Sequence, residues 1–210
     1  MFKKIIFGLS LWLFATTLSF GANFQDGVNA IEKGDYKTAF TIFEDLASKG
    51  DAGAQYNLGV MYYNGKGVRQ DYKKAFEWYE KAAAQGYVDA QFNLGVMYER
   101  GQGVKQDYKI AKEWYEKAAT QGDANAQFSL GAMYDLGMGV KQDYKKAFEW
   151  TEKSAKQGYA GAQYNLGVMY VKGEGVRQDK KRAKEWFGKA CDGGYQKGCD
   201  TYKILNQQGY

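Results

Sequence analysis

The sequence predicts an all-α protein, a right-handed α-solenoid of tandem helix-loop-helix repeats of 36 residues. Three observations support this prediction. The same residues return at a fixed spacing through most of the chain, each unit has two segments with helical apolar spacing, and paired glycines separate the two segments. A period of this length is typical of stacked units that cannot bury their apolar faces alone.

Four units share the same marker residues. A leucine followed by glycine recurs at Leu58, Leu94, Leu130 and Leu166. A tryptophan recurs in the second segment at Trp78, Trp114, Trp150 and Trp186. A closing glycine recurs at Gly86, Gly122, Gly158 and Gly194. These markers divide the chain into repeats at 52–87, 88–123, 124–159 and 160–195.

The first segment of the first repeat predicts a helix over residues 52–64, where small and apolar residues follow helical spacing. Gly59 lies in mid-helix, where glycine costs about 1 kcal/mol relative to alanine. Because this glycine returns in every copy, we expect a neighbouring helix to lie against the bare backbone. The paired glycines Gly65 and Gly67 predict a sharp turn after the helix.

The second segment predicts a helix with a cap at each end. The carboxylate of Asp71 is expected to accept hydrogen bonds from free amides of the first turn. Gly86 is expected to end the helix in a left-handed conformation. The inner stripe of this helix is expected to consist of Ala75, Trp78, Tyr79 and Ala82.

Capping structure is expected at both ends, because the outermost units of a solenoid lack a neighbour. Residues 23–51 match the repeat only in their second half and predict an N-terminal capping hairpin. Residues 196–210 predict one closing helix of the first type, with its core leucine replaced. With two helices in each repeat, the chain is expected to form eleven helices.

Residues 1–22 have the three-part layout of a secretory signal. Lys3 and Lys4 precede an apolar run over residues 5–18, and small residues allow cleavage after Gly21 or Ala22. The alternative is an uncleaved membrane anchor, but a spanning helix needs about 20 apolar residues and this run is shorter. We therefore expect a periplasmic or secreted protein without stable membrane insertion after signal removal.

Composition narrows the function further. Without Lys3 and Lys4 the chain has 27 basic and 24 acidic residues, a net charge of +3, which is too mild to indicate a nucleic acid partner. The chain has no histidine, which excludes histidine-ligated zinc and a Ser-His-Asp triad. We therefore expect no cofactor, no metal and no catalytic residue.

The repeat resembles the Sel1-like repeat, a relative of the tetratricopeptide repeat. The resemblance lies in Ala-Gln-Tyr-Asn-Leu-Gly-Val-Met-Tyr from Ala54, Gly-x-Gly-Val from Gly65, and Asp-Tyr-x-x-Ala-x-x-Trp-Tyr-x-x-Ala-Ala from Asp71. It covers nearly the whole chain after residue 22. One departure is a basic residue at the loop position that often holds proline in the family, which makes the loop less stiff: Arg69, Lys105, Lys141 and Arg177.

The two cysteines resemble those of a cysteine-rich secreted branch of this family, first described from Helicobacter. Cys191 lies late in the last second-type helix and Cys199 lies in the closing helix. The resemblance implies a disulfide between them, and an exported protein meets an oxidising compartment. That branch usually bridges many repeats, whereas here only the last junction has a pair. A free redox pair is the alternative.

The resemblance implies a scaffold that binds a protein partner in envelope signalling, complex assembly or host contact. In tetratricopeptide relatives the first-type helices line a concave face, which gives these candidate partner-binding residues: Tyr56, Tyr63, Asn64, Phe92, Glu99, Arg100, Phe128, Asp135, Leu136, Tyr164, Val171 and Lys172. The four aromatic residues at the first of these repeat positions form a ladder that could instead fill the seam between repeats.

A basic track through the loops and second helices is interpreted as a solvated face, because a glutamate follows four residues after the first lysine of each second helix, as in Lys73 and Glu77.

The alternative function is a β-lactam-binding protein or weak β-lactamase, with a β-lactam or cell-wall fragment as ligand. The sequence contains no Ser-x-x-Lys, Ser-Asp-Asn or Lys-Thr-Gly motif to support it.

Overall fold

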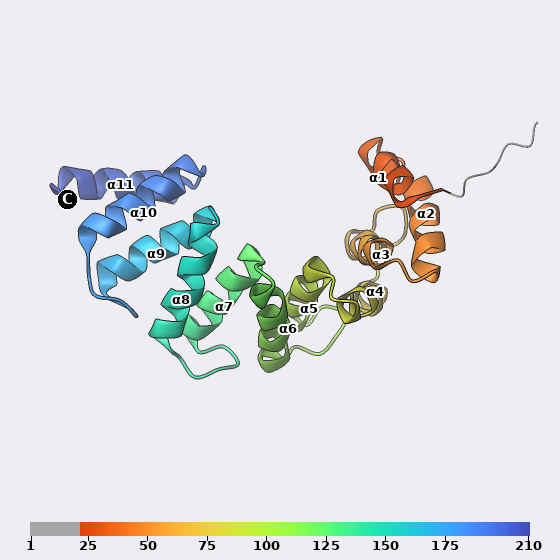
Figure 1. The fold of residues 1–210 in the computed structure, drawn as a ribbon, viewed down its shortest axis with the longest axis horizontal. Helices are drawn as coiled ribbons and strands as arrows, with labels where there is room; N and C mark the ends of the chain where they lie inside the picture. The colour runs from red at the N-terminus through yellow and green to blue at the C-terminus, as the bar shows by residue number, and fades with distance from the viewer. Residues whose placement is uncertain (1–21) are drawn as a thin grey trace, which may run out of the picture.

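The computed structural model describes residues 22–210, and this part of the chain is a succession of eleven helices without strands (Figure 1). The predicted all-α solenoid is confirmed. The helices are α1 (Phe24–Glu32), α2 (Tyr36–Ser48), α3 (Ala52–Asn64), α4 (Tyr72–Ala84), α5 (Val88–Arg100), α6 (Tyr108–Thr120), α7 (Ala124–Leu136), α8 (Tyr144–Lys156), α9 (Ala160–Lys172), α10 (Lys180–Asp192) and α11 (Gln196–Gln207).

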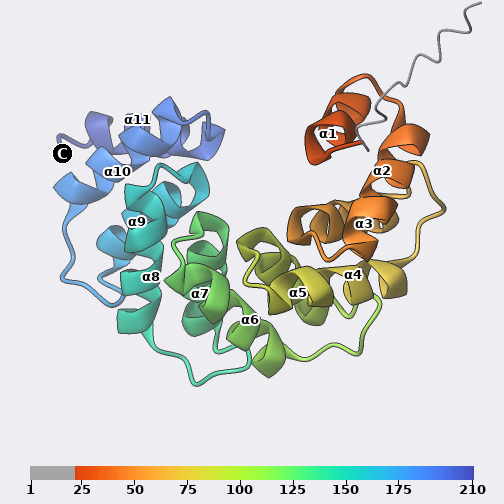
Figure 2. The same cartoon turned by 45° about the vertical axis from the view of Figure 1, so that its right-hand side comes forward.

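The helices form an open arc with α1 and α11 at opposite ends (Figure 2). Each helix packs mainly against the helices that precede and follow it in the chain. The first helices of the repeats, α3, α5, α7 and α9, lie toward the inner side of the arc, and the second helices lie toward the outer side (Figure 2). A partner inside the arc would therefore meet the first helices.

In three of the four repeats, the core forms where a ring of the second helix meets a glycine of the first. Leu58 is fully buried, and a Cβ added to Gly59 would lie 2.5 Å from the ring of Tyr79 on α4. The same contact joins Gly95 to Tyr115. The expectation that a helix lies against the bare backbone is confirmed, and that helix is the second one of the same repeat.

The predicted inner stripe of the second helix is correct for three residues and wrong for Trp78. Ala75, Tyr79 and Ala82 are buried, whereas Trp78 is only half-buried. The tryptophan lies at the edge of the stripe, where it packs against the cores of two consecutive units. The Nζ of Lys81 covers its ring at 3.9 Å from the centroid. Trp78 therefore closes a seam instead of filling the core.

The predicted caps are confirmed. The carboxylate of Asp71 accepts a hydrogen bond from the amide of Lys74 at 3.0 Å, and Gly86 has a φ of +86°. The second loop glycine has a role that the sequence did not indicate. Gly67 has a φ of +74°, and a Cβ there would overlap the carbonyl oxygen of Tyr36 at the start of α2. Each such loop thus rests on the preceding second helix.

A row of buried glutamines joins consecutive repeats. The Oε1 of Gln55 accepts a hydrogen bond from the Nε2 of Gln85 at 2.8 Å, and two further pairs repeat the bond at 2.7 and 2.8 Å. Gln163 has the same position in the fourth repeat, but residue 193 is glycine where the others have the donor glutamine. Within residues 22–210, the buried Oε1 of Gln163 has no hydrogen-bond partner.

Gly193→Gln is expected to complete this row and to raise the free energy of unfolding by about 1 kcal/mol, because a buried acceptor gains its donor. Gly193 has a φ of −76°, which any residue adopts. Urea denaturation followed by circular dichroism measures the change. Gly193→Ala is the control, because it adds only the Cβ, which would lie 3.0 Å from the Cβ of Ala160. Equal stability of the two variants would contradict the explanation.

A disulfide joins Cys191 of α10 to Cys199 of α11, with the Cα atoms 4.5 Å apart. The bridge fastens the closing helix, which has a neighbour on one side only. Leu205 and Gly198 are the buried residues of α11, so the helix has little other apolar anchorage.

Replacing both cysteines by serine is expected to lower the free energy of unfolding by about 2–3 kcal/mol, because a short closed loop is released in the unfolded chain. The amides of α11 should lose protection from hydrogen exchange before those of α9. Reduction of the unaltered protein serves as a control and should give the same pattern. If α11 kept its protection in both samples, the bridge would not be its main anchor.

The predicted signal and its cleavage site fall in residues 1–22 and so lie outside the described residues, apart from Ala22. Among the helices that the structure describes, none is long and apolar enough to cross a membrane.

Candidate functional site

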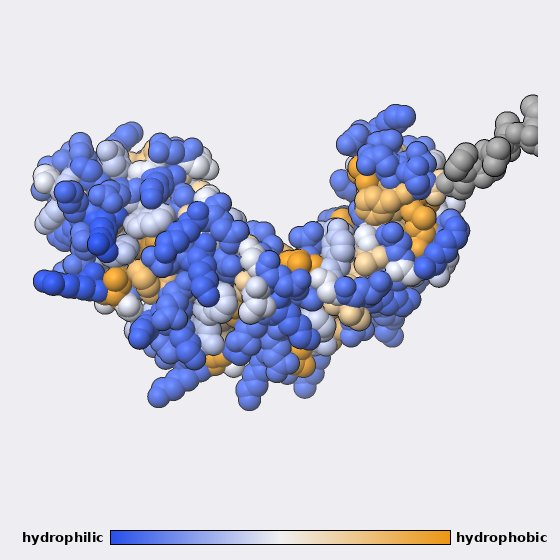
Figure 3. Space-filling model, in the orientation of Figure 1, coloured by the Kyte–Doolittle hydropathy of each residue, from blue (hydrophilic) through white to orange (hydrophobic). Residues whose placement is uncertain are grey.

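The inner side of the arc is the candidate site, and the space-filling view shows a hollowed surface where apolar patches lie among hydrophilic side chains (Figure 3). Two pockets lie between consecutive first helices on this side. One lies between α3 and α5, and the other lies between α7 and α9.

The first pocket, between α3 and α5, has a volume of about 360 Å³. Its floor includes the ring of Tyr79, and its lining residues are Tyr56, Val60, Tyr63, Asn64, Phe92, Asn93, Val96 and Arg100. The hydroxyl of Tyr63 donates a hydrogen bond to the Oε1 of Gln102 at 2.8 Å, which fixes one wall of the pocket. Arg100 is exposed at its rim. The pocket therefore offers apolar rings and one cation.

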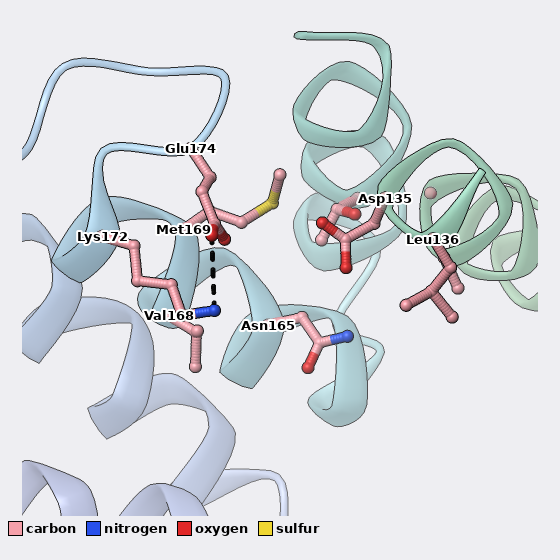
Figure 4. A pocket seen from close by; sticks show the side chains of 10 residues that line it. Asp135, Leu136, Asn165, Val168, Met169, Lys172 and Glu174 are labelled. Atoms are coloured by element: carbon pink, nitrogen blue, oxygen red, sulfur yellow. Dashed lines mark ion pairs between the residues drawn. The ribbon is translucent and has the colours of Figure 1, made fainter. Parts of the chain in front are cut away.

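The second pocket, between α7 and α9, has a volume of about 190 Å³ (Figure 4). Its lining residues are Gly131, Ala132, Asp135, Leu136, Thr151, Asn165, Val168, Met169, Lys172 and Glu174. The Nζ of Lys172 lies 3.4 Å from the Oε1 of Glu174. Burial and the Glu174 carboxylate raise the pKa of Asp135, and the Lys172 ammonium opposes this. This pocket therefore offers carboxylates and apolar walls.

The structure places eight of the twelve candidate residues in these two pockets, and a ninth, Tyr164, is half-buried outside them. Five line the first pocket: Tyr56, Tyr63, Asn64, Phe92 and Arg100. Asp135, Leu136 and Lys172 line the second pocket, and Leu136 is 65% exposed.

The remaining candidates have structural contacts. The Glu99 carboxylate accepts a hydrogen bond from the hydroxyl of Tyr115 at 2.5 Å, and burial together with this carboxylate raises the pKa of Tyr115. Val171 packs against the C-terminal core. Phe128 lies with its centroid 5.0 Å from that of Tyr159.

The aromatic ladder lies half in the seam and half in the groove. The ring of Tyr56 stacks on Tyr87, the residue before α5, with the centroids 4.9 Å apart, and Tyr164 lies 5.1 Å from Tyr195, the residue before α11. All four ladder rings are half-buried. Tyr56 and Phe92 also form part of the first pocket. The ladder thus joins repeats and leaves ring edges accessible on the inner side.

The expected lysine–glutamate pairs on the basic track are not formed. Among the described residues, the ion pairs do not include Lys73–Glu77 or its three equivalents. Exposed long side chains gain little by pairing and lose rotamer freedom, which accounts for the difference. The next lysine, Lys74, instead lies with its Nζ 5.2 Å from the ring centroid of Tyr62.

Two of the pocket residues that were not predicted, Ala132 and Thr151, differ from their equivalents in all the other repeats. Position 151 holds an aromatic residue in the other repeats, namely Tyr79, Tyr115 and Phe187. Position 132 holds valine in the other repeats, namely Val60, Val96 and Val168. These departures are visible in the repeat alignment, and they could have indicated the pocket.

The arrangement suits binding. Among residues 22–210 no group of three histidine, cysteine, aspartate or glutamate side chains could hold a metal ion. Both pockets are open grooves with polar groups at the rim and apolar side chains below, which is the usual composition of a recognition surface.

Comparison with known proteins agrees with the repeat division. The family model described as Sel1 repeat matches residues 52–87, 88–123, 124–159 and 160–195. Among curated proteins, none matches the chain in sequence.

Several solved structures are similar. A protective antigen of uropathogenic Escherichia coli strains with an SLR fold is 34% identical, with a TM-score of 0.85 over 89% of this chain, which spans 41% of that protein's length. A Sel1 repeat protein from Oxalobacter formigenes is 34% identical, with a TM-score of 0.81, covering 86% of this chain and 74% of that one. Helicobacter pylori cysteine-rich protein B is 26% identical, with a TM-score of 0.51, covering 63% of this chain and 95% of that one.

Proposed function

The chain belongs to the Sel1 repeat family of scaffolds, whose repeats generally mediate protein–protein interaction, and from this premise we propose that it binds a protein partner along the inner side of its arc. The proposal places the partner in the groove formed by α3, α5, α7 and α9. Fold alone does not fix function, so the support has to come from the residues in the groove.

One observation supports this placement most strongly: the groove changes chemically from repeat to repeat while the scaffold stays constant. The buried leucine and the glycine after it are the same in all four repeats. The last two positions of the first helices differ in every repeat, and six of these eight residues line the pockets. The eight residues are Tyr63, Glu99, Asp135 and Val171, and Asn64, Arg100, Leu136 and Lys172. A surface that varies on a constant frame can distinguish one partner segment from another.

The shape of the groove favours an extended or helical segment of the partner. Such segments bind in grooves through side chains that enter successive pockets. Half-buried rings such as Tyr56 and Phe92 are already held by their neighbours, so they bury contact area with little further loss of entropy. We infer that the two pockets receive two separate side chains of one segment.

The proposed location is the periplasm or the outside of the cell. The signal-like layout of residues 1–22 supports export. The disulfide between Cys191 and Cys199 supports an oxidising compartment.

The test is photocrosslinking in the native cell. A benzophenone amino acid replaces Phe92 in the first pocket in one variant and Tyr144, 40% exposed at the start of the outer helix α8, in the control. We expect mass spectrometry to find a protein adduct from position 92 and no such adduct from position 144. Recovery of lipids or glycans alone, or equal adducts from both positions, would contradict the proposal.

A further inference from the structure

The pocket between α7 and α9 corresponds at most of its lining positions to the groove between α3 and α5, but two of these positions hold smaller side chains. Thr151 replaces Tyr79, and Ala132 replaces Val60. The ring of Tyr79 covers Gly59 in the first groove, where the glycine does not reach the pocket. Gly131 lines the second pocket, so this pocket extends to the backbone of α7.

The same pocket has also gained charge. In the first groove, Tyr63 and Gln102 form a neutral hydrogen bond of 2.8 Å. The corresponding residues of the second pocket are Asp135 and Glu174. Figure 4 shows Asp135 entering from α7 and Glu174 entering from the loop after α9, on opposite sides of the pocket. A neutral pair is thus replaced by two carboxylates.

The negative charges of Asp135 and Glu174 are only partly neutralised by nearby cations. Lys172 is the one cation among the lining residues, and it lies on the Glu174 side, 3.4 Å from that carboxylate. Asp135 has no ion-pair partner among the described residues. With two carboxylates and one ammonium, the lining has one negative charge more than it has positive charges. Half-burial of a carboxylate beside a like charge disfavours its charged form, and an approaching cation would favour it.

We propose that this pocket receives a lysine or arginine side chain of the partner polypeptide. The aliphatic stem would lie against Val168 and Met169, and the cationic head would lie between Asp135 and Glu174 (Figure 4). Leu136, exposed at the rim, would contact an apolar residue next to the basic one. This inference rests on the proposed binding of a protein partner along the inner side of the arc.

A basic side chain fits the two carboxylates and the apolar wall of this pocket better than a metal ion does. Apolar side chains form much of the wall, and a metal ion would gain nothing from them. A guanidinium group donates several hydrogen bonds in one plane and matches carboxylates well.

The experiment selects random dodecapeptides on the full protein by display and measures the selected peptides by fluorescence anisotropy. We expect the selected peptides to contain lysine or arginine, and we expect its replacement by glutamine to weaken binding at least tenfold. Thr151→Tyr and Ala132→Val, which restore the residues of the other repeats and so keep the fold, should each weaken binding, the first at least tenfold. Asp135→Asn should weaken binding about tenfold.

The matched control is Glu149→Gln, which removes one exposed carboxylate from the outer helix α8 and should change affinity less than twofold. The inference is overturned if no peptide is selected, if the basic residue is dispensable, or if Thr151→Tyr binds as well as the unaltered protein. Peptides that bind only the groove between α3 and α5 would overturn this inference and leave the proposed function standing. The failure of the crosslinking test at position 92 would count against the proposed function instead.

Discussion

Tyr115→Ala is expected to lower the free energy of unfolding by about 3–5 kcal/mol, the range for removing a large buried ring. The ring is 1% exposed and fills the space over the bare backbone of Gly95. It also packs against Phe92, with the centroids 5.6 Å apart, so its loss would disturb the inner groove as well as the core. Urea denaturation followed by circular dichroism measures the change.

Tyr115→Phe is the control for this prediction. It keeps the ring and removes only the hydrogen bond to Glu99, so it should cost about 1 kcal/mol. An equal loss in the two variants would show that the ring contributes little, and that the glycine–ring contact does not stabilise the repeats that have it.

Gly103→Ala is expected to lower the free energy of unfolding by about 3 kcal/mol or more. Gly103 has a φ of +72°, and a left-handed conformation costs a residue with a Cβ roughly 1–2 kcal/mol. The added Cβ would also overlap the carbonyl oxygen of Tyr72 at the start of α4. Relieving that overlap requires one repeat to move away from the next, and overpacking of this kind typically costs about 1–3 kcal/mol.

Gly122→Ala separates the two causes. Gly122 has a φ of +99°, but no atom lies within 4 Å of the position that its Cβ would take. This variant should therefore show the backbone cost alone. The same denaturation measurement applies to both proteins, and equal losses would contradict a role for the loop glycine in joining repeats.

The arrangement of helices and loops could be predicted from the sequence because the same marker residues recur in all four repeats. The aspartate cap and the closing glycine depend on contacts within one unit, and the buried leucine follows the apolar spacing of its own helix. Leu58, Asp71 and Gly86 therefore lie where their local patterns indicate.

Features that depend on two units were harder to predict. Trp78 is an apolar residue at helical spacing, but its burial depends on two consecutive cores. The loop glycine Gly67 is constrained by a carbonyl of the preceding unit. Periodicity within a single repeat carries no information on either contact.

The sequence predicted most of the groove positions but not the two small residues that shape the second pocket. The prediction identified groove positions by resemblance, and most of them line the two pockets. The second pocket forms because two side chains are smaller than in the other repeats: Thr151 replaces an aromatic ring, and Ala132 replaces a valine. The repeat alignment shows both departures, and the fold adds that the two residues face the same space as Asp135.

The two pockets have different charges, which gives the groove a direction. Arg100 lies at the rim of the first pocket, and Asp135 and Glu174 line the second. A partner segment with an acidic residue toward α3 and a basic residue toward α9 would match both. The reverse orientation would bring like charges together, which disfavours wrong docking.

The central claim is that the inner side of the arc binds a protein. The most direct test measures the affinity of the crosslinked partner, once purified, for three proteins: the unaltered chain, Arg100→Glu in the groove, and Lys37→Glu, exposed on the N-terminal helix α2. We expect Arg100→Glu to weaken binding at least tenfold and Lys37→Glu to change it less than twofold. Equal affinity of all three proteins, or a loss confined to Lys37→Glu, would contradict binding along the inner side of the arc.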